Sequence, residues 1–234
     1  MKLDVDGFAR LLDYSLLHPA TTEKEIFMFC EKIKKYKYGT AYVLPTNLPL
    51  IKERLSDTLT RLGVGISFPF GTSTTATKCF ECEEAIKSGA EDLDVVINIG
   101  ALKSLNYNKV LNELKELIKV VHPHMLKIVL EVSYLTKKEI IEGTKICCDA
   151  GVDFVKTATG FGSRATMIND TELILNNVTN DVKVKVAGGI NNVDTILELY
   201  SKGVEKFGVS EGEQLVEEFI EKYNGEYNIE REKI

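Results

Sequence analysis

Residues 93–131 read LDVVINIGALKSLNYNKVLNELKELIKVVHPHMLKIVLE, and this stretch contains the repeating unit that decides the fold. It begins with the apolar run LDVVIN and ends with a second apolar run, LKIVLE. Between them, apolar residues recur at i, i+3, i+4 and i+7 from Tyr107 to His122, which predicts an amphipathic helix. The order strand, helix, strand is typical of a unit that places two strands parallel in one sheet.

Similar apolar runs occur along the whole chain at intervals that suit repeated strand–helix units. The eight runs are LLDYSL from Leu11, TAYVL from Thr40, GVGISF from Gly63, LDVVIN from Leu93, LKIVLE from Leu126, DFVKT from Asp153, VKVKV from Val182 and KFGV from Lys206. Near-continuous apolar strands indicate a parallel sheet covered on both faces, and eight units in 234 residues match an α/β fold, the (β/α)8 TIM barrel. The alternative is an open doubly wound sheet, which normally has fewer strands.

No linker or shift in composition divides the chain, so we predict a single domain. The barrel is expected over residues 1–223. Residues 224–234 are expected to form a polar C-terminal tail, frayed or docked only through its tyrosines.

The composition argues against several classes of protein. The balance of 29 basic and 35 acidic residues, with no basic block, makes nucleic acid an unexpected partner. The chain shows no signal peptide and no apolar run of the ~20 residues that cross a bilayer, so we expect no membrane and a cytoplasmic location. The five cysteines suit a reducing compartment, and Cys79 and Cys82 lack the second pair of a zinc ribbon.

Three ionisable residues stand within apolar strands: Asp94, Lys156 and Lys185. In a barrel, the active site is built at the carboxyl ends of the strands, so polar residues there are candidates for chemistry. Such charges are costly unless they are paired, and these three can neutralise one another if they meet inside the barrel. Lys183 shares a strand face with Lys185, but its place at the strand start suits a side chain that reaches solvent.

A pair of lysines at one site has a chemical use. A cationic neighbour makes protonation of an amine less favourable, which frees that amine as a nucleophile. We assign Lys156 as the nucleophile, Lys185 as the residue that lowers its pKa, and Asp94 as the carboxylate that moves protons. A buried ion-pair network without turnover is the alternative, and the residues alone give both interpretations similar weight.

Glycines follow the last two predicted strands, as Gly188 and Gly189 and then as Gly208 before Ser210. Backbone amides exposed there, next to a helix N-terminus, form the phosphate site common in such barrels. A phosphorylated substrate is therefore expected. Ordinary turn formation is the alternative explanation for these glycines.

With these residues assembled, the chain resembles the deoxyribose-phosphate aldolase family, class I lyases on a (β/α)8 barrel. The resemblance covers about Leu11 to Val216. Its most specific segments are LDYSLLHPATT (12–22), SFPFGTSTTATK (67–78), GAEDLDVVINIGALKS (89–104), KIVLEVSYLT (127–136), DFVKTATGFG (153–162) and VKVAGGI (184–190).

The resemblance implies reversible cleavage of 2-deoxy-D-ribose 5-phosphate to D-glyceraldehyde 3-phosphate and acetaldehyde, with no cofactor and no metal. It implies a Schiff base on Lys156, a pKa-lowering role for Lys185 and a proton relay through Asp94, with support from Asp13 and Ser15. The phosphate is expected to meet backbone amides at Gly160, Gly188, Gly189 and Ser210. We also expect a homo-oligomer, whose size the sequence does not give.

Several positions depart from the family pattern. Tyr42 and Leu44 replace a cysteine and a polar residue, and the GFGSRAT loop is about one residue short. Glu211 stands where a small residue commonly follows Ser210, so it either points away or weakens phosphate binding. Arg164 would offset that charge or lie solvated in its loop. Two other functions stay open: a Schiff-base aldolase for another sugar phosphate, and a non-catalytic sugar-phosphate-binding barrel.

Overall fold

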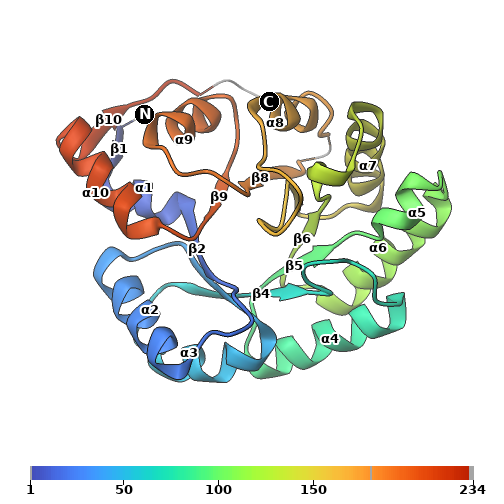
Figure 1. Cartoon of the computed structure of the whole chain (residues 1–234), viewed down its shortest axis with the longest axis horizontal. Helices are drawn as coiled ribbons and strands as arrows, with labels where there is room; N and C mark the ends of the chain where they lie inside the picture. The colour runs from blue at the N-terminus through green and yellow to red at the C-terminus, as the bar shows by residue number, and fades with distance from the viewer. Residues whose placement is uncertain (1, 180, 232–234) are drawn as a thin grey trace.

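Eight parallel strands close into a barrel in the computed structural model, which describes residues 2–179 and 181–231 (Figure 1). Each predicted strand is present, so the predicted (β/α)8 barrel is confirmed and the open sheet is wrong. The barrel strands are β2 (Leu12–Leu16), β3 (Thr40–Val43), β4 (Arg61–Ile66), β5 (Asp92–Val96), β6 (Met125–Val129), β7 (Phe154–Lys156), β8 (Lys183–Ala187) and β9 (Lys206–Val209). Strand β9 pairs with β2 and closes the ring.

Helices form the outer ring around the strands (Figure 1). They are α1 (Val5–Leu11), α2 (Glu23–Tyr36), α3 (Leu48–Arg54), α4 (Thr75–Ser88), α5 (Ile99–Lys103), α6 (Tyr107–Val121), α7 (Lys137–Ala150), α8 (Ile168–Leu175), α9 (Val193–Ser201) and α10 (Gly212–Tyr223), with short 3₁₀ turns at η1 (Pro45–Asn47) and η2 (Val132–Tyr134). Within the described part of the chain, no helix has the length and apolar character to cross a bilayer.

Local sequence signals set the helix boundaries. Helices α2 and α7 each begin with a capping box, in which a threonine side chain and a glutamate three residues later satisfy each other's backbone amides. Helix α4 ends at Gly89, whose φ of 108° is a left-handed conformation that suits glycine. The predicted helix from Tyr107 matches α6, which buries Val110, Leu114 and Leu117 against the barrel.

The strands are buried on both faces, and the two faces have different chemistry. Every residue of β5 is buried. Because side chains alternate along a strand, Leu93 and Val95 share one face while Asp92 and Asp94 share the other. The aspartates belong to a polar network within the barrel, which leaves Leu93 and Val95 facing the helices. The interior of the barrel therefore carries charges, and the apolar core lies between strands and helices.

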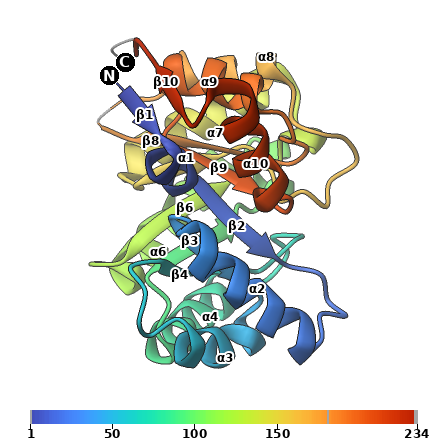
Figure 2. The ribbon, with the colours of Figure 1, turned by 90° about the vertical axis from the view of Figure 1, so that its left-hand side faces the viewer.

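The two ends of the chain meet outside the barrel. Strand β1 (Lys2–Asp4) pairs antiparallel with β10 (Glu226–Asn228), and Figure 2 shows them side by side. The ring of Tyr227 packs on Tyr223, and Arg231 forms an ion pair of 2.8 Å with Glu205. The tail is thus docked by a strand and an ion pair as well as by its tyrosines, which corrects the narrower prediction. Its last three residues, 232–234, lie outside the described residues.

Candidate active site

A pocket of about 550 Å³ opens at the carboxyl ends of the barrel strands. Its walls come from β2, β7, β8 and β9 and the loops that follow them, and these strands are consecutive neighbours in the ring. Figure 2 shows β2 running toward this face, which is turned to the viewer in Figure 1. Six of the nine residues singled out from the sequence line the pocket: Ser15, Lys156, Gly160, Gly188, Gly189 and Ser210. The other three are buried side chains of the barrel interior: Asp13, Asp94 and Lys185.

Lys156 is the last residue of β7 and lines the pocket while being only 3% exposed. Its Nζ lies 2.6 Å from Oδ2 of Asp94. In the strand register it stands beside Lys185 of β8, whose Nζ lies 3.0 Å from the same oxygen. The three residues predicted to meet inside the barrel are therefore brought together on a single carboxylate oxygen.

Burial lowers the pKa of Lys156 below the ordinary lysine range. The carboxylate of Asp94 opposes this effect, and the ammonium of Lys185 adds to it. For Asp94, burial alone would raise the pKa, but the charges of Lys156, Lys185 and Lys127 outweigh burial and hold it at about 2. The site thus combines an ionised acceptor with an amine that loses its proton more easily than usual. Such an amine at a pocket wall can attack a carbonyl group.

Asp13 and Ser15, both on β2, occupy different places. The buried carboxylate of Asp13 lies 2.7 Å from Lys185 and 3.2 Å from Lys127. Ser15 is half-buried, lines the pocket and donates a hydrogen bond of 3.3 Å to the backbone oxygen of Asp13. Asp13 therefore belongs to the charge network beneath the pocket, whereas Ser15 faces the space that a substrate would enter.

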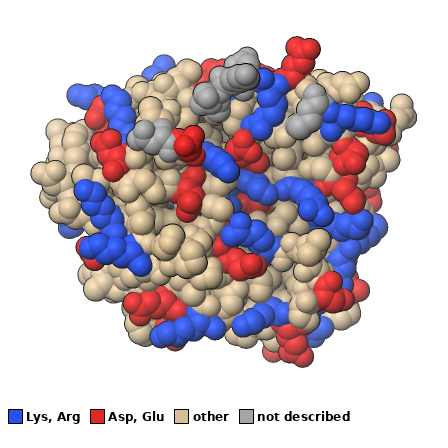
Figure 3. Space-filling model, turned by 180° about the vertical axis from the view of Figure 1, so that it is seen from behind, with Lys and Arg blue, Asp and Glu red and all other residues tan. Residues whose placement is uncertain are grey.

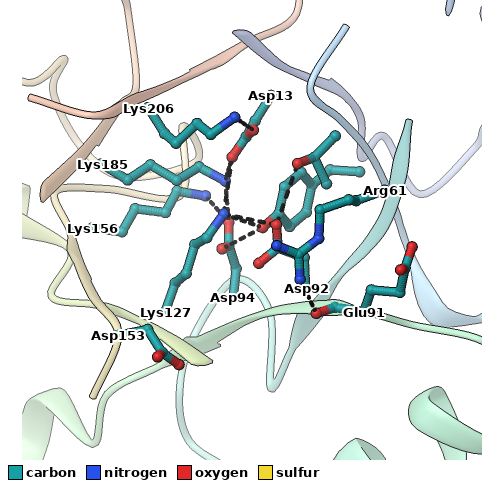
Figure 4. A network of polar contacts seen from close by, with 12 residues as sticks. Asp13, Arg61, Glu91, Asp92, Asp94, Lys127, Asp153, Lys156, Lys185 and Lys206 are labelled. Atoms are coloured by element: carbon teal, nitrogen blue, oxygen red, sulfur yellow. Dashed lines mark hydrogen bonds and ion pairs between the residues drawn. The ribbon is translucent and has the colours of Figure 1, made fainter. Parts of the chain in front are cut away.

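The network includes three further side chains that the sequence analysis did not select: Lys127, Asp92 and Tyr42. Lys127 lies 2.9 Å from Asp92 and donates to the hydroxyl of Tyr42 at 3.1 Å. Burial, followed by the charges of neighbouring aspartates, raises the pKa of Tyr42 well above its usual value, so the hydroxyl stays protonated. Figure 4 shows Lys127 and Asp92 converging with the other charged groups of the network from different strands. A signal for Lys127 was present, because it interrupts the apolar run LKIVLE as Lys156 interrupts its own strand.

The fully buried charges of this network balance. Three carboxylates lie within it together with three ammonium groups, all at most 3% exposed: Asp13, Asp92, Asp94, Lys127, Lys156 and Lys185. Because each charge has a partner at hydrogen-bond distance, the network avoids the large cost of an isolated buried ion. Its connected donors and acceptors also provide a route by which protons can move to and from the amine of Lys156.

The glycines after β7 and β8 line the same pocket as Lys156. Gly188 and Gly189 have successive φ values of 88° and 86°, a conformation that disfavours other residues. A Cβ on Gly189 would also lie 2.7 Å from Ala165. Gly160 lines the same wall, and Ser210 follows β9 just before α10. The predicted phosphate-binding residues thus line one pocket, and Ser210 lies beside the N-terminus of α10, where backbone amides favour anions.

Glu211 lines the pocket next to Ser210, and its side chain is exposed. It makes no capping hydrogen bond to α10. Arg164 does not offset its charge, because its guanidinium binds both carboxylate oxygens of Asp170 at 2.6 and 3.1 Å. The interpretation of Arg164 as a charge offset for Glu211 is wrong: the side chain is 34% exposed in its loop and anchors that loop through Asp170.

Glu131 holds the loop after β7 in place. It is 1% exposed and adopts a left-handed conformation with φ of 55°. Its Oε2 accepts from the backbone amide of Thr159 at 3.0 Å and from the hydroxyl of the same residue, and its Oε1 accepts from Ser133 at 2.9 Å. The strained backbone and buried charge at Glu131 thus fix the segment that leads from Lys156 to Gly160.

The cysteines lie away from the pocket. Cys79 and Cys82 are on α4, and all five cysteines are free thiols. Burial raises the pKa of the thiols of Cys79 and Cys82, which disfavours the reactive thiolate. Among the described residues, no three His, Cys, Asp or Glu side chains are placed to hold a metal ion.

Comparison with known proteins gives a consistent result. Residues 14–213 match the model of the DeoC/LacD family of aldolases. The chain is 36% identical over 210 residues to deoxyribose-phosphate aldolase 1 of Staphylococcus aureus, covering 90% of this chain and 96% of the relative. It is also 36% identical over 208 residues to deoxyribose-phosphate aldolase of Dictyoglomus turgidum, covering 89% and 95%.

Solved structures show the same architecture. The aldolase QR15 superposes with a TM-score of 0.87 at 33% identity, covering 92% of this chain and 97% of QR15. The deoxyribose-phosphate aldolase of Aeropyrum pernix, described as a tetramer, superposes with a TM-score of 0.83, covering 92% and 91%. At 24% sequence identity, this structural similarity shows a shared fold and no more.

Proposed function

The chain belongs to the DeoC/LacD family of aldolases, and on that basis we propose that it is a lyase that reversibly cleaves 2-deoxy-D-ribose 5-phosphate to D-glyceraldehyde 3-phosphate and acetaldehyde. One observation carries the proposal. Lys156 lines a pocket from the barrel interior, and its amine, with a lowered pKa, lies 2.6 Å from the carboxylate it shares with Lys185. A site that only held phosphate would not require this arrangement.

In the proposed mechanism, the neutral amine of Lys156 attacks the C1 aldehyde of the open-chain sugar. Loss of water from the carbinolamine gives a Schiff base. Removal of the proton from the C3 hydroxyl then breaks the C2–C3 bond, and its electron pair moves into the enamine attached to Lys156. Glyceraldehyde 3-phosphate leaves. Protonation of the enamine at C2 and hydrolysis of the resulting Schiff base release acetaldehyde and return the amine.

Asp94 is proposed to relay protons in these steps, directly or through a water molecule, because it contacts both amines. Lys185 contributes a positive charge that disfavours protonation of Lys156. Asp13 holds Lys185 through a contact of 2.7 Å, and Ser15 faces the substrate from β2.

The phosphate group is proposed to bind at the other end of the pocket. Backbone amides around Gly160, Gly188, Gly189 and Ser210 are the expected donors, since all four residues line this cavity. An amine at the buried wall together with the proposed anion site on the loops would suit a sugar phosphate.

We further propose that residues 1–223 form the catalytic domain and that the chain works as a homo-oligomer in the cytoplasm. The tetrameric relative from Aeropyrum pernix supports self-association, and the free thiols suit a reducing compartment. The pairing of β10 with β1 attaches the C-terminal segment to this domain.

Borohydride trapping tests the function most directly. Incubation with acetaldehyde and borohydride should leave a reduced two-carbon adduct on Lys156, found by peptide mapping. Lys156→Leu should abolish both the adduct and turnover, whereas Lys183→Leu, an exposed lysine nearby in the barrel, should keep both. An adduct on Lys185, or loss of activity with a chelator, would contradict the mechanism. Use of dihydroxyacetone phosphate as the donor in place of acetaldehyde would indicate an aldolase for another sugar phosphate. Binding of the sugar phosphate without turnover would indicate a non-catalytic barrel.

A further inference from the structure

A second pocket, of about 510 Å³, opens at the opposite end of the barrel from Lys156. Its lining includes residues at or just before the amino ends of four neighbouring strands, β9, β2, β3 and β4. Lys206 begins β9, Arg10 precedes β2, Gly39 precedes β3 and Arg61 begins β4. Figure 3 shows the molecule from this side, with Lys and Arg side chains gathered near the centre of the face.

The lining of this pocket is strongly basic although the chain has a net charge of −6. Among the described residues, five cationic side chains and one carboxylate, that of Asp57, line it; the cations are Arg10, Lys34, Lys37, Arg61 and Lys206. The charges are therefore concentrated here against the overall balance of the protein. A concave basic surface attracts anions because the field of its charges is focused in the cavity.

In the part of the chain that the structure describes, neither arginine has a carboxylate partner. Within residues 2–179 and 181–231, no hydrogen bond or ion pair engages the guanidinium of Arg10, and Arg61 donates to the backbone oxygen of Glu91 at 2.9 Å. The lysines differ, because Lys34 pairs with Asp57, Lys37 with Asp6, and Lys206 lies 3.9 Å from Asp13. Two guanidinium groups with free donors thus remain, and their planar forks match phosphate oxygens.

We propose that this pocket is a second anion site, which binds a small phosphate-bearing molecule at the end of the barrel opposite the candidate active site. Arg10 and Arg61 supply the forked donors, since the charges of Lys34 and Lys37 are already paired with Asp57 and Asp6. The proposal concerns binding at the amino ends of the strands and does not depend on the reaction catalysed at the carboxyl ends.

A calorimetric titration with inorganic pyrophosphate tests the proposal by measuring the affinity and the number of binding sites. Because the candidate active site is also proposed to bind phosphate, the titration starts from Ser210→Asp, which places a carboxylate at that proposed phosphate site. This variant should still bind pyrophosphate at one site. Adding Arg10→Gln should weaken that binding about tenfold or more, since a charge-assisted contact is lost. Arg10 is exposed, so this variant is expected to fold.

A matched control is Lys115→Gln on α6, which removes the same charge from an exposed helix position outside the pocket. It should leave the pyrophosphate affinity of Ser210→Asp unchanged. The proposal is overturned if Ser210→Asp binds no pyrophosphate, or if Arg10→Gln and Lys115→Gln give the same affinity. Failure of the aldolase assay would leave this result unaffected, because calorimetry needs no turnover.

Discussion

The hydroxyl of Tyr42 donates a hydrogen bond of 3.0 Å to Oδ1 of Asp94, while Lys156 and Lys185 both contact Oδ2. The Nζ of Lys185 also lies 3.6 Å from the centroid of the Tyr42 ring, a cation–π contact. Tyr42 therefore fixes the orientation of the carboxylate and the place of one amine at once. It is a positioning residue, since it does not line the pocket.

Tyr42→Phe should lower kcat and leave KM nearly unchanged. The variant keeps the ring beneath Lys185 and removes the donor to Asp94, so the carboxylate can rotate away from the amines. A hydrogen bond to a charged group contributes about 1.5–3 kcal/mol, which corresponds to a loss in kcat of about tenfold or more. Tyr38→Phe is the matched control, because that buried hydroxyl has no hydrogen-bond partner within the described chain. Equal kcat values for the two variants would refute the positioning role.

Lys185→Met should shift the pH dependence of Schiff-base formation to higher pH. Burial and then the charge of Lys185 lower the pKa of Lys156, so removing Lys185 lets that pKa rise. The neutral fraction of the amine at neutral pH then falls, and the trapping rate reaches its plateau at higher pH than in the wild type. The rate of borohydride trapping, measured against pH, reports this midpoint. Lys183→Met, exposed on the same strand, should not move it; an unshifted midpoint in Lys185→Met would rule out the tuning role.

Glu211→Gln should lower KM for the phosphorylated substrate and leave kcat unchanged. Glu211 lines the pocket beside Ser210, so its charge repels a phosphate dianion across solvent. Relief of this repulsion is on the order of 1 kcal/mol in water, or a several-fold change in KM. Glu221→Gln, an exposed position in the last turn of α10, is the control. A higher KM in Glu211→Gln would mean that the glutamate assists binding.

The sequence predicted the fold because each strand of a parallel barrel is buried on both faces and so appears as an apolar run. It also predicted that Asp94, Lys156 and Lys185 would meet, since charges within such runs need partners. Lys127 and Asp92 were missed for a physical reason. Which side chains share a layer depends on the register between strands, such as Asp94 beside Lys127, and a single strand pattern does not give this register.

The second pocket was beyond sequence analysis for a related reason. Arg10, Arg61 and Lys206 are far apart in the chain, and each alone resembles an ordinary exposed cation. Only ring closure, with β9 paired to β2, brings them around one cavity. Tyr42 was not selected for the same reason, because its positioning role depends on a hydrogen bond across the barrel to Asp94.

A buried ion pair outside the site gives a test of stability. Lys78 on α4 lies 2.7 Å from Glu113 on α6 and donates to the backbone oxygen of Val96 at 2.7 Å, and Val96 is the last residue of the strand that carries Asp94. Both side chains are at most 2% exposed. Lys78→Met leaves the carboxylate of Glu113 buried without its cation, so the free energy of unfolding should fall by about 3–5 kcal/mol.

The double variant Lys78→Met with Glu113→Leu should recover much of this loss, because no uncompensated charge remains and two apolar side chains fill similar space. Part of the loss should persist, since the oxygen of Val96 still lacks its donor. Urea unfolding measures the free energies of unfolding of the wild type, Lys78→Met and the double variant. The control is Lys87→Met, which breaks an exposed pair with Glu84 and should lower the free energy of unfolding by at most about 1 kcal/mol. If the double variant were as unstable as Lys78→Met, the loss would come from packing around α4 and not from the buried charge.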